Sequence, residues 1–325
     1  MSLLAHTVVI VNERAGGGKM ADTFRRVEHR LDDVLDAWEV RFTDGPNHAT
    51  ELARDALREG AETILVAGGD GTVNEVINGF FEPLQTRQDG CDSSRPQPIR
   101  ATARLGLLAG GTGGDFRKSL RMPDMNAAID ALAAGHTRRI DLGMLTYTDT
   151  ASRQQRYRLF QNIASVGLGG LVDRYVKQLP RLPGRLAYAA ASFRALIAYR
   201  NPLVRLTVDD HFEAELPAAI VAVANGRFFG GGMMVCPSAK LDDGLFDVTV
   251  LGDLSKWELA TLSATIYDGA HIYNPKVITR RGTRVTCSGA GEREDVYLDV
   301  DGEPLGRLPA SFEIIPDALT LIAPT

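Results

Sequence analysis

The sequence predicts two domains, an α/β Rossmann-like half followed by a mostly antiparallel β-sandwich half. The chain has 325 residues, of which 44% are hydrophobic, and this is enough material for two cores of ordinary domain size. From Thr7 to about Ala134, short β-branched runs alternate with amphipathic helical stretches, as in a parallel sheet with crossover helices. After Arg138, strand-like segments predominate. We therefore expect domains at 1–137 and 138–325, and we allow for the extreme C-terminal segment packing back on the first domain.

The individual elements follow from hydrophobic periodicity and turn residues. Strands of the first half are expected at Thr7–Asn12, Trp38–Thr43, Thr63–Ala67 and Leu105–Ala109. Helical spacing is found in the group Met20, Phe24, Val27, Leu31 and Val34 and in the group Leu52, Ala56 and Leu57. Residues 84–103 are polar and rich in Pro and Ser, which predicts a surface loop.

In the second half, strands are expected at Arg139–Tyr147, Tyr157–Ser165, Val204–Val208, Ala219–Ala224, Phe246–Leu251, Arg284–Ser288 and Val296–Val300. Two helices interrupt them, at roughly Gly184–Tyr199 and Ser255–Ala270. Ser255 and Glu258 have the spacing of a capping box at the start of the second helix.

Composition narrows the partners and the compartment. The net charge of −5 argues against a general nucleic-acid binder. The three cysteines are odd in number and far apart, so we expect neither disulfides nor a metal site of closely spaced cysteines, and a reducing cytoplasm is the simpler setting. No apolar run approaches the roughly 18 residues of a membrane span. If its substrate were a lipid, a protein without a membrane span would have to bind the membrane at its surface.

The strongest motif is a glycine turn between a buried strand and a helix, Leu65–Glu75. Gly68, Gly69 and Gly71 allow the backbone to approach a ligand, and amides at a helix start favour a polyanion. Glycine turns are also common as plain connectors, so the turn alone leaves the structural interpretation open. Asp70 favours the functional one, because a carboxylate beside a phosphate needs a cation or a proton.

A second loop of the same kind follows the next strand at Leu107–Phe116, with Asp115 inside the turn. Ligands of open α/β sheets bind beyond the carboxyl ends of the strands, so both loops, together with Asn12–Gly18 and Thr43, should line one edge. Neither GxxxxGK[ST] nor a GxGxxG at the first turn is present, which disfavours ordinary P-loop kinases and NAD dehydrogenases.

In its motifs the chain resembles the diacylglycerol kinase catalytic-domain superfamily, which includes bacterial soluble lipid kinases and sphingosine kinases and is distantly related to NAD kinase. The segments that carry the resemblance are GGDGTVNE at 68–75, GTGGDF at 111–116, IDLG at 140–143, Asn162 with 167–170, KLDDGLFD at 240–247 and DGE at 301–303. They occur in the family's order over essentially the whole chain.

The resemblance implies a kinase that uses ATP and Mg²⁺ to phosphorylate a lipid hydroxyl. Its nucleotide-binding residues would be Asn12, Gly16, Thr43, Gly68, Gly69, Asp70, Gly71, Thr72, Glu75, Gly111, Thr112 and Asp115. The family's proton acceptor would be Glu303, with Asp70 as the rival and Asp301 as a further catalytic acid. Asp141 and Asp301 also have a structural interpretation, as a turn residue and as the first residue of a hairpin turn.

The resemblance also implies a structural divalent cation, Mg²⁺ or Ca²⁺, held by the Asp243 carboxylate and by main-chain oxygens of Lys240 and Leu245. Without the resemblance, this Asp-Asp-Gly segment is simply a turn.

The chain departs from the family at two places. Glu13 and Ala15 stand where Pro and Ser are usual, and Gly114 stands where Asn usually precedes the Asp. These altered loops suggest one alternative, a nucleotide-binding regulator without turnover. A second alternative is an NAD kinase-like enzyme, which would also need the GGDGT loop, although the KLDDGLFD and DGE segments favour a lipid over NAD.

Residues 173–205 carry seven basic residues against the single acid Asp173. They are Arg174, Lys177, Arg181, Arg185, Arg194, Arg200 and Arg205. With the apolar residues between them, they favour peripheral docking on an anionic membrane, although a core helix with a solvated charged face would have the same pattern. We expect a cytoplasmic protein that associates peripherally with the membrane, and a homodimer stays open.

Overall fold

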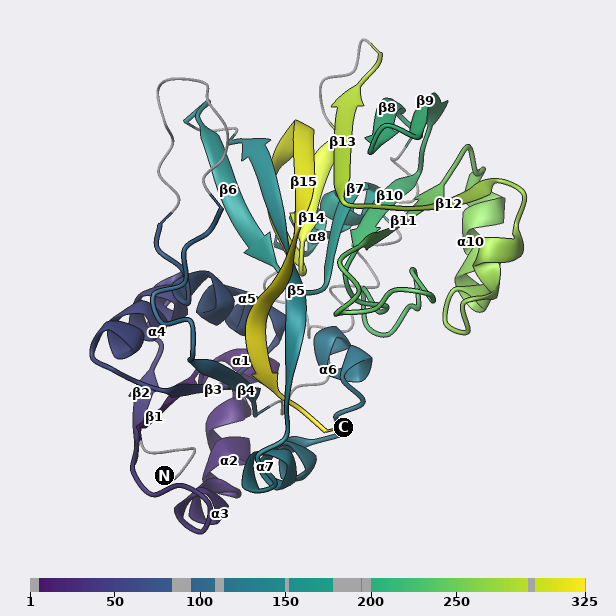
Figure 1. The fold of residues 1–325 in the computed structure, drawn as a ribbon. Coiled ribbons are helices and arrows are strands. Elements are labelled where there is room, and N and C mark those ends of the chain that lie inside the picture. The colour runs from purple at the N-terminus through teal and green to yellow at the C-terminus, as the bar shows by residue number, and fades with distance from the viewer. Residues whose placement is uncertain are drawn as a thin grey trace. The chain divides into compact units, whose positions relative to one another are not determined.

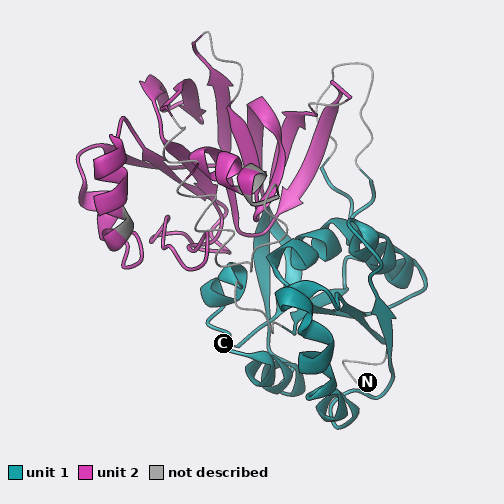
Figure 2. Cartoon of the chain, turned by 180° about the vertical axis from the view of Figure 1, so that it is seen from behind, with its two compact units in different colours: residues 1–142, 315–325 teal, residues 143–314 magenta. Residues whose placement is uncertain are grey.

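The structure is a computed structural model that describes residues 6–83, 95–108, 114–149, 152–177, 194, 200–291 and 296–324. The chain divides into two compact units (Figure 2). The first unit contains residues 1–142 and 315–325, and the second contains residues 143–314. Within the described residues, no helix has the length and apolar character needed to span a membrane.

The first unit is an α/β layer structure around a parallel sheet (Figure 1). Its elements are β1 (Thr7–Val11), α1 (Ala15–Gly18), α2 (Met20–Arg25), α3 (Glu28–Asp32), β2 (Trp38–Phe42), α4 (His48–Arg58), β3 (Thr63–Ala67), α5 (Asp70–Gly79), β4 (Arg104–Leu107), α6 (Asp115–Ser119) and α7 (Met125–Ala133). The strands lie in the order β2–β1–β3–β4, and the end of β15 (Glu303–Ile322) pairs with β4 in parallel. The predicted parallel α/β half is confirmed.

Burial explains why β1 and β3 were readily predicted. Every residue of these two strands is buried, because helices cover both faces of a parallel sheet. Pairing in register sets Val11 opposite Ala67, so the two strands end side by side. The residues that follow these strands therefore meet at one sheet edge.

The helical region after β1 differs from the prediction. The spacing of Met20, Phe24 and Leu31 is confirmed in that all three are buried, but the segment forms two short helices instead of one. The α-helical hydrogen-bond pattern is interrupted at Val27, because its amide donates to the carbonyl of Phe24, three residues earlier, at 2.9 Å. Val27 is also β-branched, which lowers its helix propensity.

The second unit is mostly antiparallel, as predicted. Its elements are β5 (Thr137–Thr148, shared with the first unit), β6 (Gln155–Phe160), β7 (Ile163–Gly167), α8 (Leu168–Lys177), β8 (Leu203–Val208), β9 (Phe212–Pro217), β10 (Ile220–Ala224), β11 (Phe246–Leu251), α10 (Lys256–Thr265), η1 (Ala270–Tyr273), β12 (Val277–Gly282), β13 (Arg284–Gly289), β14 (Tyr297–Val300) and most of β15. The strands run β12–β11–β10–β7–β14–β15, with β5 and β13 also pairing with β15. Phe160 anchors the core, stacked on Phe246 at 5.7 Å and edge-on to Phe312 at 6.4 Å between ring centroids.

Several predicted boundaries were wrong in the second unit. Tyr157–Ser165 is two strands, because the chain turns at Gln161 and Asn162. The helix predicted to end at Ala270 ends at Thr265, although its capping box between Ser255 and Glu258 is confirmed. The predicted helix Gly184–Tyr199, apart from Arg194, and residues 84–94 of the predicted loop lie outside the described residues.

Candidate active site

Three strand ends of the first unit meet at one edge of the sheet. The Thr43 amide donates to the Val11 carbonyl at 3.0 Å, and the Asn12 amide donates to the Ala67 carbonyl at 2.9 Å. The predicted grouping of Asn12, Thr43 and the turn at Gly68 is thus confirmed. Strand β4 pairs with β3 in parallel and so ends at the same edge, but residues 109–113 of the loop that follows, among them Gly111 and Thr112, lie outside the described residues.

Asn12 links the first loop to the glycine turn. Its Nδ2 donates to Thr72 Oγ1 at 2.8 Å, and its Oδ1 accepts from the Arg14 amide at 3.1 Å. Thr72 is buried. An added Cβ at Gly68 would lie 2.5 Å from Thr72 Cβ, so glycine is what lets the turn close on Thr72. Asn12 therefore positions the turn.

The loop after β1 contains three successive residues with left-handed backbone, Gly16, Gly17 and Gly18. This is why α1 is not a right-handed helix, and glycine adopts such a conformation without strain. A Cβ at Gly17 or Gly18 would meet no atom within 4 Å. The backbone at Gly17 and Gly18 is therefore open to close approach by a ligand.

Asp70 and Asp115 lie side by side, each at the first residue of a helix. The Asp115 amide donates to Asp70 Oδ2 at 2.8 Å, and Lys118 Nζ pairs with Asp115 Oδ1 at 2.8 Å. Burial raises the pKa of Asp70, and the charge of Asp115 adds to this, while the amides of Asp115 and Phe116 and the Lys118 ammonium oppose it. Two neighbouring carboxylates, with Asp115 buried and Asp70 partly buried, favour a proton or a hard cation.

Carboxylate oxygens are the ligands that Mg²⁺ prefers, so this pair has suitable donors, and Mg²⁺ would share Asp115 with the Lys118 ammonium. The two residues would supply part of a coordination sphere, with phosphate and water oxygens as the remainder. No cluster of three or more His, Cys, Asp or Glu residues suited to a metal occurs in the part of the chain that the structure describes.

Gly114 and Glu75 have contacts that sequence reasoning missed. A side chain at Gly114 would meet the side chain of Arg117. The Glu75 carboxylate accepts from the amides of Asn47 at 2.9 Å and Ala49 at 3.2 Å, so it holds the start of α4. A contact of Glu75 with nucleotide stays a prediction.

In the second unit, Asp301 and Gly302 form the two-residue turn between β14 and β15. Both have positive φ, 50° and 86°, as in the hairpin turn that Asp-Gly favours. The buried Asp301 carboxylate accepts from the amides of Ile163 at 3.0 Å and Gln161 at 3.3 Å. It therefore fixes the turn between β6 and β7, and Glu303, the first residue of β15, follows directly and is half-buried.

A set of buried polar residues lies beside this turn: Gln161, Asn162, Ser165, Asn225 and Asp299. Of these, the sequence analysis named only Asn162 among the residues that carry the family resemblance. Ser165 Oγ donates to Asp299 Oδ2 at 3.5 Å, and Asn225 Nδ2 donates to the Gln161 carbonyl at 3.1 Å. Two acids alternating with valine in an apolar strand, Asp299 and Asp301, were the signal that could have found Asp299.

Asp141 has a main-chain partner within the first unit. Its Oδ1 accepts from the Asp317 amide at 2.8 Å, and the residue is buried. The structural interpretation of Asp141, which ties β5 to the end of β15, is favoured by this contact.

At the predicted metal site, the Asp243 carboxylate lies beside the guanidinium of Arg281. Arg281 pairs with Asp243 and, at 3.2 Å, with Asp247, and Asp243 Oδ1 also accepts from the Leu245 amide at 3.3 Å. Burial raises the pKa of Asp247, and Arg281 opposes that rise. Since Arg281 already neutralises this carboxylate, the residues do not fit a divalent cation well. The site at Lys240, Asp243 and Leu245 stays a prediction.

Comparison with known proteins decides the family. The diacylglycerol kinase catalytic domain matches residues 6–145, and the YegS C-terminal NAD kinase beta sandwich-like domain matches residues 162–323. A diacylglycerol kinase of Mycobacterium tuberculosis (strain ATCC 25618 / H37Rv) is 30% identical over 305 residues, which are 92% of this chain and 87% of that protein. The chain belongs to the diacylglycerol kinase family.

Other members of the diacylglycerol kinase family match at similar length. One from Staphylococcus epidermidis (strain ATCC 12228 / FDA PCI 1200) is 30% identical over 326 residues, 97% of this chain and 91% of its own. A crystal structure of a diacylglycerol kinase from Bacillus anthracis str. Sterne shares the fold, with a TM-score of 0.67 and 21% identity over 98% of this chain and 97% of that chain. An NAD kinase from Archaeoglobus fulgidus in complex with ATP gives a TM-score of 0.50 and 13% identity over 97% and 93%.

Proposed function

We propose that this member of the diacylglycerol kinase family transfers the γ-phosphoryl group of ATP to a lipid hydroxyl on a diacylglycerol-like or sphingoid-like acceptor. The observation that carries the proposal is the contact of Asp70 with Asp115 at an edge where glycine turns follow parallel strands. Relatives named diacylglycerol kinase support the lipid acceptor. An ATP complex of a protein with the same fold supports the nucleotide.

On the donor side, the phosphates would lie against the backbone of Gly68–Thr72 and the start of α5, where amides favour negative charge. Asn12 holds this turn in place through Thr72. Asp70 and Asp115 are the residues that would hold Mg²⁺, which when bound supplies neutralisation of phosphate charge.

On the acceptor side, the lipid hydroxyl oxygen bonds to the γ-phosphorus while the bond to the departing ADP oxygen breaks, and the hydroxyl proton passes to a carboxylate. We assign the role of proton acceptor to Glu303. Asp70 is the weaker candidate, because its carboxylate already accepts the Asp115 amide. Asp301 acts as a positioning residue, since its carboxylate is bonded to main-chain amides and Glu303 begins the next strand.

The test is incubation of the purified chain with labelled ATP and a total lipid extract, followed by mass spectrometry of the products. A phosphorylated diacylglycerol or sphingoid base supports the proposal. Label on NAD instead of lipid would support the NAD kinase-like alternative. ATP binding without turnover on any acceptor would support the regulator that Ala15 and Gly114 suggest.

Peripheral association of a cytoplasmic protein with anionic membrane through residues 173–205 is part of the proposal. Of its basic residues, Arg194 lies with its guanidinium over the Tyr175 ring at 4.4 Å, and Arg205 pairs with Glu215 at 3.1 Å. Arg181 and Arg185 lie outside the described residues. Replacing Arg181, Arg185 and Arg194 with Gln should weaken binding to anionic vesicles, and unchanged binding would contradict this assignment.

A further inference from the structure

Lys118 pairs with a buried carboxylate of the candidate site. It lies three residues after Asp115 on α6, so the two side chains share one face of the helix. Lys118 Nζ lies 2.8 Å from Asp115 Oδ1, and the Asp115 side chain is only 9% exposed, whereas that of Lys118 is 31% exposed. Since a carboxylate in so dry a place needs a partner, this pair differs from an ion pair on the open surface.

The Lys118 ammonium acts on both carboxylates of the site. The Asp115 amide donates to Asp70 Oδ2 at 2.8 Å, which brings the two acids together. Burial and the charge of Asp115 raise the pKa of Asp70, and the charge of Lys118 opposes this rise. Lys118 thus supplies positive charge to the same two acids that, under the proposed function, would hold Mg²⁺.

A lysine and a divalent cation make different demands on Asp115. An ammonium only donates hydrogen bonds, whereas Mg²⁺ takes oxygen ligands at about 2.0–2.1 Å. Sharing Asp115 would set an ammonium beside a divalent cation, and the two positive charges repel each other. The flexible four-carbon stem of lysine allows the ammonium to move, and the partial exposure of Lys118 leaves it room to do so.

A nucleotide would offer the ammonium a second partner at the same sheet edge. The glycine turn Gly68–Thr72 is the expected phosphate site, and Asp70 of that turn is already bonded to Asp115. Phosphates bound on this turn would therefore lie beside the residues that Lys118 contacts. Lysine binds phosphate oxygens as a mobile point charge.

From these contacts we propose that Lys118 is an exchangeable counter-ion of the candidate site. In the protein alone it pairs with Asp115, and it binds a phosphate oxygen of the nucleotide once Asp115 holds a divalent cation. This rests on the proposed function, in that the site must bind a nucleotide together with Mg²⁺. Lys118 then has two opposite effects: it competes with the cation for Asp115, and it strengthens binding of the cation–nucleotide complex. An ion pair that only stabilises α6 has neither effect.

Lys118→Met separates the two effects, because it removes the ammonium and keeps a long side chain. At pH 8 without nucleotide, the variant should bind Mn²⁺, used as a spectroscopic substitute for Mg²⁺, about two- to fivefold more tightly than the wild type in a paramagnetic resonance titration. Its affinity for Mg-ATP in a calorimetric titration should instead fall by about tenfold or more. Lys118→Arg keeps the positive charge and should retain most of the Mg-ATP affinity.

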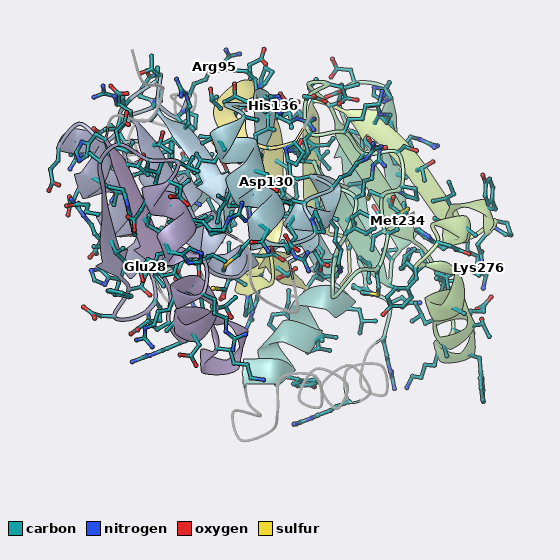
Figure 3. The ribbon with its side chains drawn as sticks, turned by 90° about the horizontal axis from the view of Figure 1, so that it is seen from below. Glu28, Arg95, Asp130, His136, Met234 and Lys276 are labelled. Carbon is teal, nitrogen blue, oxygen red and sulfur yellow. The ribbon has the colours of Figure 1, made fainter. Side chains whose placement is uncertain are left out.

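The matched control is Arg30→Met in the same unit. Arg30 pairs with Asp130 at 2.8 Å and has a side chain that is 33% exposed, but the Asp130 side chain is 69% exposed. Asp130, which Figure 3 labels, lies on α7. Arg30→Met removes one positive charge from an equally short ion pair, so the Mn²⁺ and Mg-ATP affinities should both stay at the wild-type values.

The proposal is overturned if Lys118→Met leaves the Mg-ATP affinity unchanged, or if it does not tighten Mn²⁺ binding. It is also overturned if Arg30→Met produces the same two changes, because net charge alone would then explain them. Both titrations contain no lipid, and turnover is measured separately on the lipid extract. The expected changes in a wild type and variant that show no turnover would refute the kinase alone, and turnover with unchanged affinities would refute the role of Lys118 alone. A wild type that binds no Mg-ATP would refute both.

Discussion

Gly68→Ala tests whether the glycine turn is closed by packing against Thr72. The new Cβ would lie 2.5 Å from Thr72 Cβ and 2.8 Å from its Oγ1, against the 3.5–4.0 Å of an ordinary carbon contact. Thr72 must move by about 1 Å, which would break its bond to Asn12. Overpacking costs about 1–3 kcal/mol and the hydrogen bond about 1 kcal/mol. We expect a loss of roughly 2–4 kcal/mol in unfolding free energy, or roughly 5–15 °C in Tm.

Gly69→Ala is the matched control one residue away. A Cβ there meets no atom within 4 Å, and its backbone is extended, so Tm should be unchanged. If phosphate lies against this backbone, however, Gly69→Ala should weaken ATP binding. Thermal unfolding followed by calorimetry with Mg-ATP separates the two effects. An unchanged Tm in Gly68→Ala would refute the packing argument, and wild-type ATP affinity in Gly69→Ala would refute the phosphate cradle.

Four further variants test the acids and the ion pairs of Arg281. Burial raises the pKa of Asp70, so the folded state loses stability as pH rises through that pKa. Asp70→Asn should therefore raise Tm at neutral pH and lose this advantage in acid. Thermal unfolding measured across pH would show both effects. Glu303→Gln should lower kcat by a factor of about 10²–10⁴ and leave Tm unchanged. Asp301→Asn should instead lower the free energy of unfolding by about 2 kcal/mol. The reverse pattern would mean that Asp301 accepts the proton and Glu303 holds the turn. Arg281→Gln should lower the free energy of unfolding by about 1–3 kcal/mol. Chelation of divalent cations with EDTA should leave the wild-type Tm unchanged. A Tm lowered by EDTA would instead favour a divalent cation at Asp243.

The parts of the fold that were predictable from sequence are those where burial and periodicity agree. The strand Thr63–Ala67 was predicted to the residue, because it is buried on both faces and glycine and polar residues flank it. The strand β15 was missed, because Pro304, Gly306 and Pro309 disrupt its strand pattern while pairing with β5, β14 and β13 holds it extended. Propensity is local, and long-range pairing overrides it.

The candidate site shows the same limit. Motif order grouped Asp70 with Asp115, since both loops follow parallel strands and such strand ends lie at one edge. Contacts between distant elements were hidden: nothing in the spacing of Glu75 and Asn47 indicates that the carboxylate caps another helix, or that Arg281 reaches Asp243 across the turn. Sequence order identifies which loops converge, but side-chain pairing depends on packing.

Asp301 illustrates why a motif residue need not be the reacting one. Its carboxylate sits in a turn that already suits Asp-Gly, and both oxygens accept main-chain amides of the β6–β7 turn. A carboxylate whose two oxygens are both bonded to main-chain amides is held in place by the protein. The same bonds fix the backbone from which Glu303 projects. Under the proposed function, the DGE segment would separate two tasks, with Asp301 setting the position of the backbone and Glu303 accepting the proton.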